Sequence, residues 1–392
     1  MKRASLMSGP ALKAMILAAG RGTRARPLSL TAPKPMIPIL GRPVLERLLE
    51  YLAASGFADV VINTSYRAPE IEDAIRDGSP YGLSVGYSFE GHIDSQGRVI
   101  DVPLGSAGGM RRVQDHSGFF DSTFVVLCGD ALIDVDLQDV VAEHRRRGAL
   151  ATLVAKRVPM DEVSSYGVVV AESSGKVVSF QEKPQPEDAK SNLVNTGIYV
   201  FEPRIFDFIP KDSTYDIGSQ LFPDLVEVGE SLFVSEREFR WVDLGSAKDY
   251  WSATQFLLTE GRDLARPAGR EVRPGLFVGA NVSVDLSKVR ITGPVVLGSS
   301  CRVADGATIV GPSVIGQGAV LAADVNLVRS IVCDRTRLWL APIEDAIYTP
   351  SHLIMSSGAV IPSPSLSGVP LVGDRRASPH QTGQVRAFPA SA

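Results

Sequence analysis

Short apolar runs alternate with amphipathic stretches from residue 13 to about residue 262. Runs of Val, Ile, Leu and Ala without a polar face are typical of strands in a parallel sheet, and apolar residues three and four apart are typical of helices. Helices are expected over Val44–Ser55 and Pro69–Asp77. The expected strands are Met15–Ala19, Asp59–Asn63, Leu83–Ser88, Thr123–Cys128, Ala151–Ala155, Gly167–Ala171, Val177–Gln181 and Gly197–Phe201. The alternation predicts an α/β fold with a doubly wound, mostly parallel sheet and a ligand where the strand order reverses.

A second pattern follows a predicted linker, residues 263–274, that is rich in Pro, Gly and Arg. Bulky apolar residues recur there at intervals of six, and a small or apolar residue stands four positions after each. The bulky positions are Ile291, Leu297, Val303, Ile309, Ile315, Leu321 and Leu327. The small or apolar positions are Val295, Cys301, Ala307, Ser313, Ala319 and Val325. Such hexapeptide repeats predict a parallel β-helix over residues 275–347. Ile331 and Val332 arrive early for this phase, so a cap is expected over Arg335–Ile347.

Composition excludes several classes of protein. The 392 residues are 44% hydrophobic, which is enough for two domains and a large core. No apolar segment is long enough to cross a bilayer, and no apolar stretch follows the basic start, so a cytoplasmic protein without a membrane partner is expected. A net charge of −4 argues against nucleic acid as a partner. The three cysteines lack metal-ligand spacing, and the five histidines form no cluster and are expected at the surface.

Both ends of the chain differ from the two patterned regions. Residues 1–12 form an extension before the first expected strand. From Tyr348 to residue 392 the chain is rich in Ser, Pro and Gly and has no periodic apolar face, so this tail is expected to be disordered.

The most informative chemistry lies in the turn after the first strand. Gly20 and Gly22 allow main-chain N–H groups to approach a ligand closely, and Arg24, Arg26 and Lys34 add positive charge. This combination suits a polyphosphate, although a plain turn with solvated arginines would look similar. The dinucleotide fingerprint is excluded because Ala25 stands where its third glycine belongs, and the P-loop is excluded because no Gly-Lys-Ser/Thr follows.

Two carboxylates follow buried strands and precede turns. Asp130 ends the run from Phe124, and Asp243 ends the run from Phe239. Ligands of parallel sheets lie beyond such strand ends, and carboxylates there suit Mg²⁺ and phosphoryl or nucleotidyl transfer. A helix N-cap or loop role is the alternative for Asp130. Asp134 and Asp136 are weaker candidates, because their segment also resembles a solvated edge before a helix.

A polar, phosphorylated small molecule is a candidate ligand for a further group of residues. Glu182 and Lys183 stand before Pro184, which ends a strand, and Asn195 begins another expected strand. Gly167 and the loop Pro103–Gly109 add glycines that permit close approach. An exposed Glu-Lys-Pro turn without function is the simpler alternative.

Taken together, these motifs resemble those of sugar-1-phosphate nucleotidyltransferases, a Rossmann-like family, here followed by a left-handed parallel β-helix. The resemblance covers residues 13 to about 340, with a catalytic domain over 13–262. Four family motifs stand here in family order. Gly-x-Gly-Thr-Arg-x-x-Pro…Pro-Lys-Pro runs from Gly20 to Pro35, and Gly-Asp is Gly129-Asp130. Glu-Lys-Pro is Glu182–Pro184, and Trp-x-Asp-x-Gly runs from Trp241 to Gly245.

The resemblance implies a role for each matching residue. Arg24, Lys34, Asp130 and Asp243 would be catalytic, with Mg²⁺ on Asp130 and Asp243. Contacts to the nucleoside triphosphate would come from Leu17, Ala18, Ala19, Gly20, Gly22, Thr23, Glu90, Gly105 and Ser106. The sugar 1-phosphate would be held by Gly167, Glu182, Lys183 and Asn195.

Within the family, the segments Tyr87–Glu90 and Pro103–Gly108 are similar to the mannose-1-phosphate guanylyltransferase branch, although Gly91–Asp101 is an insertion. GTP and mannose 1-phosphate are therefore the first expected substrates, with glucose-1-phosphate uridylyl or thymidylyl transfer as the alternative. A homologue that binds without catalysis is a second alternative. Acyl transfer by the β-helix is a third, which the lack of histidine in residues 263–347 argues against. A homo-oligomer formed through the β-helix is also expected.

Overall fold

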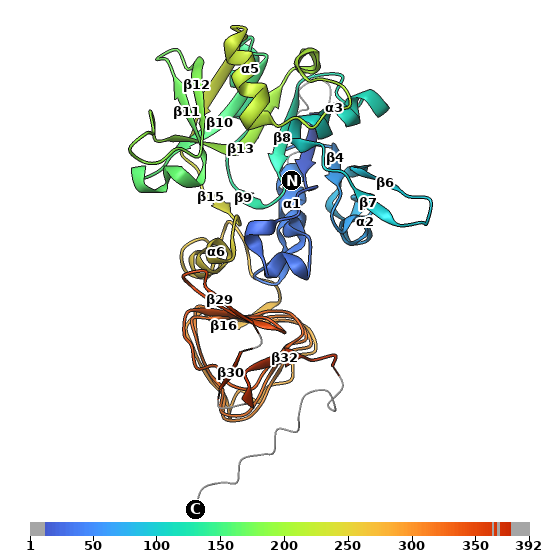
Figure 1. The fold of residues 1–392 in the computed structure, drawn as a ribbon. Helices are drawn as coiled ribbons and strands as arrows, with labels where there is room; N and C mark the ends of the chain where they lie inside the picture. The colour runs from blue at the N-terminus through green and yellow to red at the C-terminus, as the bar shows by residue number, and fades with distance from the viewer. Residues whose placement is uncertain (1–11, 363, 367–368, 378–392) are drawn as a thin grey trace, which may run out of the picture. The chain divides into compact units, whose positions relative to one another are not determined.

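The computed structural model describes residues 12–362, 364–366 and 369–377, which form two compact units (Figure 1). The first unit comprises the chain up to Arg21, residues 32–36 and residues 45–241, and the second comprises residues 22–31, 37–44 and the chain from Val242. Residues 1–11 of the predicted extension and 378–392 of the predicted tail lie outside the described residues. The boundaries expected at 262, 274 and 347 stay predictions.

A nine-stranded sheet forms the centre of the first unit. Its order is β12-β11-β13-β8-β1-β4-β5, and β10 pairs with both β13 and β14. The strands are β1 (Lys13–Leu17), β4 (Asp59–Thr64), β5 (Ser84–Phe89), β8 (Phe124–Cys128), β10 (Ala151–Arg157), β11 (Gly167–Ala171), β12 (Val177–Glu182), β13 (Leu193–Phe201) and β14 (Leu232–Glu236). Every strand expected in this region is present, and β14 is an addition.

The sheet has a parallel core with antiparallel neighbours. β1 pairs in parallel with β4 and with β8, and β4 pairs in parallel with β5. β13 runs antiparallel to β8, β10 and β11. The expected parallel arrangement therefore holds for β8-β1-β4-β5, whereas the strands beyond β8 form a mixed sheet.

Helices cover both faces of this sheet. The core that contains Ile16 takes residues from α1 (Val44–Ala54), α2 (Ala68–Ile75) and α4 (Leu137–Arg147). The core that contains Met15 takes residues from α3 (Gly105–Ser117) and α5 (Phe222–Glu227). Successive side chains of a strand point to opposite faces, so these two cores lie on the two sides of β1, as a doubly wound sheet requires.

Shorter elements connect these strands and helices. Residues 91–101, the insertion noted in the sequence, form a hairpin of β6 and β7. Short strands are β2 (Pro38–Ile39), β3 (Arg42–Pro43), β6 (Gly91–Ile93), β7 (Val99–Asp101), β9 (Ala131–Ile133) and β15 (Trp241–Asp243), and short 3₁₀ or π turns are η1 (Thr23–Ala25), η2 (Leu28–Leu30), η3 (Lys34–Met36), η4 (Ser79–Tyr81), η5 (Met160–Ser165), η6 (Pro203–Phe208) and η7 (Ile217–Leu221). Among the described residues no helix is long and apolar enough to span a membrane.

The second unit combines α6 (Ala247–Thr259) with a stack of coils whose sides are three parallel sheets (Figure 1). Arg290 pairs with Thr308 and Thr308 with Asn326, so one coil takes 18 residues. The strands are β16 (Arg270–Arg273), β17 (Leu276–Val278), β18 (Arg290–Thr292), β19 (Val295–Leu297), β20 (Arg302–Val303), β21 (Thr308–Val310), β22 (Ser313–Ile315), β23 (Val320–Leu321), β24 (Asn326–Val328), β25 (Ile331–Val332), β26 (Thr336–Leu338) and β27 (Ala346–Tyr348). The small hexad positions are all buried, and so are the bulky ones after Ile291, as predicted.

The end of the stack differs from the prediction. Val314 pairs with Ile331, so this coil is one residue shorter, and the stacking continues in phase with the early Ile331 and Val332. β26 and β27 then extend the parallel sheets through the region expected to be a cap.

Strands also occupy most of the described part of the expected disordered tail. Tyr348 is fully buried, and antiparallel strands follow it. They are β28 (His352–Met355), β29 (Val360–Pro362), β30 (Ser365–Leu366), β31 (Val369–Pro370) and β32 (Val372–Asp374). The expectation of disorder is therefore wrong for this segment.

One histidine expected at the surface is buried. His144 on α4 is completely inaccessible, with Nδ1 2.8 Å from the Thr152 hydroxyl and Nε2 3.2 Å from Oε1 of Glu202. Desolvation lowers the pKa of His144, although Glu202 opposes that shift. The folded protein therefore holds this imidazole neutral more firmly than the unfolded chain does.

We expect His144 to make stability depend on pH. The unfolded chain takes up a proton at His144 near the ordinary histidine pKa of about 6.5, whereas the folded state resists protonation. Protonation therefore favours the unfolded state, so the folded protein keeps its full stability above that pH and loses part of it as the pH falls below. Between pH 7.5 and 5.5 the melting temperature of the natural protein should fall more steeply than that of His144→Gln. The same substitution at exposed His116 should leave the slope unchanged; equal slopes for all three proteins would contradict the assignment.

Candidate active site

The turn after β1 begins with buried residues and then opens. Ala18 and Ala19 are buried, and the Ala18 N–H donates a 2.7 Å hydrogen bond to Oδ1 of Asn63. Gly20 is exposed, and a Cβ at that position would have no described atom within 4 Å. The first half of the turn is therefore fixed by β4, while the main chain at Gly20 is accessible to a ligand.

The rest of the glycine motif belongs to the second unit. Gly22 is left-handed with φ of 59°, and its carbonyl accepts hydrogen bonds from the Ala25 N–H at 3.0 Å and the Ser29 hydroxyl at 2.7 Å. Thr23 and Arg24 are exposed. Within the described residues the Arg24 guanidinium has no hydrogen-bond or ion-pair partner. Its role, and those of Gly22 and Thr23, stay predictions.

Lys34 and Asp130, which are 96 residues apart, contact each other in the first unit. Lys34 lies in η3, Asp130 follows β8, and the Lys34 ammonium forms an ion pair with Oδ2 of Asp130. Their side chains are 12% and 23% exposed, so the pair is largely shielded from water. A Cβ at Gly129 would lie 2.9 Å from the Leu17 carbonyl oxygen, so only glycine lets β8 end this close to β1.

Asp243 lies beside a second carboxylate in the second unit. A Cβ at Gly245 would lie 2.9 Å from Oδ2 of Asp243 and 3.0 Å from Oδ2 of Asp249, so both side chains converge on this glycine. Asp249 also accepts a 2.8 Å hydrogen bond from Ser246, the N-cap of α6. The sequence prediction missed Asp249, although Ser-x-x-Asp at a helix start is a recognisable capping pattern.

The weaker carboxylate candidates have structural partners. Asp136 caps α4 by accepting from the Asp139 N–H at 3.1 Å, and Asp134 accepts from both the main-chain N–H and the Nε of Arg240 at 2.7 Å. Among the residues that the structure describes, no three His, Cys, Asp or Glu side chains are grouped as a metal site. Mg²⁺ does not require such a group, because proteins usually hold it through one or two carboxylates.

Glu90 is more deeply buried than its predicted nucleotide contact suggests. It is 1% exposed, and its two carboxylate oxygens accept hydrogen bonds from Asn63 Nδ2 at 2.7 Å and from the Leu104 N–H at 2.9 Å. Burial raises the pKa of Glu90, and these donors together with the charge of Arg112 oppose the shift. Both oxygens are thus engaged inside the protein.

Ser106 and Gly105 hold the start of α3 against the segment around Tyr215. The Ser106 hydroxyl donates to Oδ2 of Asp216 at 2.7 Å and accepts from the Ile217 N–H at 2.8 Å. Gly105 has φ of +75°, and a Cβ there would lie 2.6 Å from the Tyr215 carbonyl oxygen. Burial favours a higher pKa for Asp216, but hydrogen bonds from Ser219, Ser106 and Gly218 outweigh it and hold that pKa below its usual value.

The predicted sugar-binding residues gather at one end of β11, β12 and β13. Gly167 of β11 pairs with Glu182 of β12. Val168 of β11 pairs with Val194 of β13, and because these strands are antiparallel, Gly167 lies beside Asn195. Lys183 donates to Oε1 of Glu182 at 2.7 Å, and both side chains are about half exposed, at 46% and 48%. A cation and a carboxylate are therefore available to a ligand at this edge.

Asn195 differs from its neighbours because its side chain is used within β13. Its Oδ1 accepts from the Gly197 N–H at 3.0 Å, and its Nδ2 donates to the Tyr199 hydroxyl at 3.0 Å. The Asn63 amide is likewise used inside the protein, and no local pattern predicted this, because its partners Ala18 and Glu90 lie 45 and 27 residues away along the chain.

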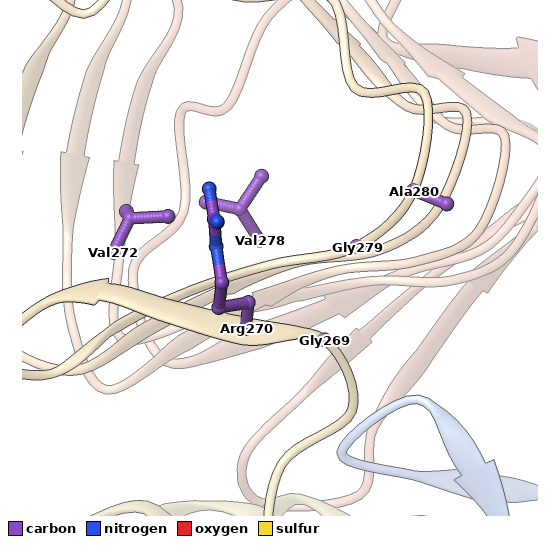
Figure 2. Close-up of a pocket in the computed structure, with 6 residues that line it drawn as sticks. All are labelled: Gly269, Arg270, Val272, Val278, Gly279 and Ala280. Carbon is purple, nitrogen blue, oxygen red and sulfur yellow. The ribbon is translucent and has the colours of Figure 1, made fainter.

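Each unit contains a pocket, and the one in the first unit adjoins the candidate loop Pro103–Gly109. In the first unit, a cavity of about 440 Å³ is lined by Leu104 and Gly108 together with Arg111, Arg112 and the loop from Pro210. In the second unit, Figure 2 shows a pocket of about 330 Å³ in which the Arg270 guanidinium stands beside Val272 and Val278, with Gly279 and Ala280 along the adjoining coil. Its lining residues come from the predicted linker and the start of the coils, and none of them was predicted as a site residue.

Comparison with known proteins decides the family. The nucleotidyl transferase family model matches residues 13–260. The chain belongs to this family. The motifs from Gly20 to Gly245 all lie within the matched region.

The relatives of this nucleotidyl transferase include enzymes named for different bases. The chain is 46% identical over 351 residues to a UTP–glucose-1-phosphate uridylyltransferase of Synechocystis, covering 89% of this chain and 90% of that protein. It is 31% identical to a mannose-1-phosphate guanylyltransferase of Mycobacterium tuberculosis, covering 83% and 80%. The crystal structure of HddC from Yersinia pseudotuberculosis matches with a TM-score of 0.52 and 25% identity, covering 62% of this chain and 97% of that one.

Substitution of Gly105 tests the close approach in this nucleotidyl transferase. Gly105→Ala should destabilise the protein by about 1–3 kcal/mol, because the new methyl group meets the Tyr215 carbonyl in a backbone conformation that already disfavours alanine. Gly97→Ala is a matched control, with φ of +77° and no described atom within 4 Å. Chemical denaturation should show that Gly105→Ala lowers the free energy of unfolding clearly more than Gly97→Ala does. Equal losses for the two variants would contradict the close approach.

Proposed function

We propose that this protein transfers a nucleotidyl group from a nucleoside triphosphate to a sugar 1-phosphate, giving a nucleoside-diphosphate sugar and pyrophosphate. The contact of Lys34 with Asp130 carries the proposal. Here a lysine ammonium, a group able to bind phosphate, lies against a carboxylate where β8 ends beside β1, and ligands of such sheets bind beyond these strand ends.

The reaction is a single in-line displacement. A phosphate oxygen of the sugar 1-phosphate attacks the α-phosphorus of the triphosphate, the bond from the α-phosphorus to the bridging oxygen breaks, and pyrophosphate leaves with the electron pair. The nucleophile is already an anion, so no general base is required. Arg24 and Lys34 act by positioning the phosphates and compensating their charge.

Two carboxylates are proposed to hold Mg²⁺. Asp130 and Asp243 offer the hard oxygen ligands that this ion prefers. When bound, the ion would neutralise negative charge on the phosphate oxygens. Lys34 already compensates the charge of Asp130, so it can turn toward a phosphate once another cation takes its place.

UTP and glucose 1-phosphate are the first substrate pair to test. The relative from Synechocystis supports this pair, and GTP with mannose 1-phosphate is the second candidate, supported by the relative from M. tuberculosis. Glu90 is buried and its two carboxylate oxygens bind N–H groups of the protein, so this side chain is a poor candidate to bind the N–H groups of a guanine. Gly167, Glu182, Lys183 and Asn195 are proposed to surround the sugar phosphate.

A structural role is proposed for the coils of the second unit. The 18-residue period and the buried hexad positions support a left-handed parallel β-helix. Residues 263–347 contain no histidine that could serve as the base in acyl transfer. Assembly of a homo-oligomer is the role that we propose for this region.

The proposed reaction can be tested directly. Purified protein with Mg²⁺ should release pyrophosphate with UTP and glucose 1-phosphate faster than with GTP and mannose 1-phosphate, and EDTA should stop the release. An assay of all common nucleoside triphosphates against several sugar 1-phosphates measures this. Release with no pair would overturn the enzymatic function, whereas preference for GTP would overturn only the choice of base.

The proposed role of Arg24 can be tested by substitution. Arg24→Ala should lower kcat on the order of a hundredfold or more, because it removes a positive charge proposed to act on the reacting phosphates. Arg26→Ala is a matched control, since Arg26 is exposed and lies two residues away, and it should change kcat only a few-fold. Equal effects of the two substitutions would argue that only the overall charge of the loop matters.

A further inference from the structure

The sequence prediction left Asn63 without a role, yet its side chain connects two segments proposed to bind the nucleotide. Asn63 lies in β4 and is 3% exposed. Its Oδ1 accepts from the Ala18 N–H at 2.7 Å, and its Nδ2 donates to Oε1 of Glu90 at 2.7 Å. The amide therefore joins the turn after β1 to a buried carboxylate.

Glu90 continues this connection to the second segment. Its Oε2 accepts from the Leu104 N–H at 2.9 Å, directly before Gly105 at the start of α3. Three hydrogen bonds thus run from Ala18 through Asn63 and Glu90 to Leu104, and we call this series the Asn63–Glu90 bridge. The main-chain oxygen of Glu90 is held separately, by the Ser65 hydroxyl at 2.9 Å and the Val102 N–H at 3.1 Å.

Packing leaves the Asn63–Glu90 bridge little freedom to move. A Cβ at Gly109 would lie 2.3 Å from Oε1 of Glu90 and 2.9 Å from Nδ2 of Asn63, so α3 touches the bridge directly. Any side chain at position 109 would displace one of the two groups. The bridge is therefore in contact with the helix that follows Leu104 as well as with Leu104 itself.

The order of donors and acceptors fixes the orientation of the bridge. Both ends are main-chain N–H groups, which only donate, so each must meet an oxygen. Asn63 consequently directs its oxygen to Ala18 and its NH₂ group to Glu90, and Glu90 must offer two accepting oxygens. Unpaired polar groups in such a buried position are costly, so a change at either residue disturbs the whole series.

We propose that Asn63 is a positioning residue for the nucleotide: through Glu90 it holds the Ala18–Gly20 turn and the Leu104–Ser106 segment at a fixed separation. This inference rests on the proposed nucleotidyltransferase function. It assigns Glu90 an indirect role in place of the direct nucleotide contact expected from the sequence, because the side chain is buried and its carboxylate oxygens bind N–H groups of the protein.

Two single substitutions should break the bridge while keeping its shape. Asn63→Asp sets a carboxylate against Glu90, and Glu90→Gln sets an NH₂ group against either Asn63 Nδ2 or the Leu104 N–H. Each should raise KM for the nucleoside triphosphate about tenfold or more, as expected for a buried donor or acceptor left without a partner. KM for the sugar 1-phosphate should change less than about twofold, because that substrate is proposed to bind at β11–β13.

The double variant Asn63→Asp with Glu90→Gln should restore binding. The new carboxylate at position 63 can accept from both the Ala18 N–H and the new amide at position 90, whose oxygen can accept from the Leu104 N–H. The same series then forms with one hydrogen bond reversed, and KM for the nucleotide should return to within about threefold of the natural value. Failure of the double variant to recover, when both single variants raise KM, would overturn the proposed bridge.

Ser65→Ala separates positioning from general destabilisation. It removes a buried hydrogen bond to the main-chain oxygen of Glu90 and leaves the carboxylate untouched, so it should lower the melting temperature without raising KM for the nucleotide. A rise equal to that of the single variants would mean that lost stability explains their effect. If the single variants do not fold, Gly109→Ala and the double variant carry the test, with a raised KM expected for the first alone.

The natural protein distinguishes this inference from the proposed function. If it releases no pyrophosphate with any substrate pair, the proposed function fails. If it is active and the single variants keep its KM for the nucleotide, the function stands and the positioning role of Asn63 is wrong.

Discussion

The close approach of β8 to β1 at Gly129 is the constraint on which the candidate site of the first unit depends. The Gly129 N–H donates to the Leu17 carbonyl at 3.0 Å, and a side chain on Gly129 would displace one strand from the other. Asp130 therefore follows the strand end directly and reaches the Lys34 ammonium. The sheet supplies the precision of this contact, because both residues stand on short segments held by neighbouring strands or prolines rather than on long loops.

Local periodicity explains which features the sequence could predict. β1, β4 and β8 are rich in apolar residues and buried on both faces, and the hexads repeat the same inward positions in each coil, so each part of the pattern supports the rest. Glu90 had no such signal: a glutamate before a glycine-rich loop can face a ligand or the protein interior. Its partners Asn63 and Leu104 lie 27 and 14 residues away, and only the folded sheet shows which interior donors reach it.

The end of the coil stack illustrates the opposite error, in which composition suggested too little structure. The segment after Tyr348 forms short antiparallel strands, and a strand of two to four residues buries too few side chains to produce a period. Tyr348 itself is anchored by donating to the Ile343 carbonyl at 2.6 Å. Ser, Pro and Gly are compatible with tight turns between such strands as well as with disorder, so composition alone could not separate the two cases.

The buried carboxylate of Glu90 also bears on how a base can be selected. An ionised carboxylate is expensive to bury, and here two N–H donors compensate it within the protein, while its burial keeps it away from a ligand. Guanine and uracil differ in ring size and in the donors and acceptors that they present, and a residue that contacts neither base cannot discriminate between them directly. Under the proposed function, the carboxylate of Glu90 would act on base selection indirectly, by keeping the Ala18–Gly20 turn and the Leu104–Ser106 segment in place.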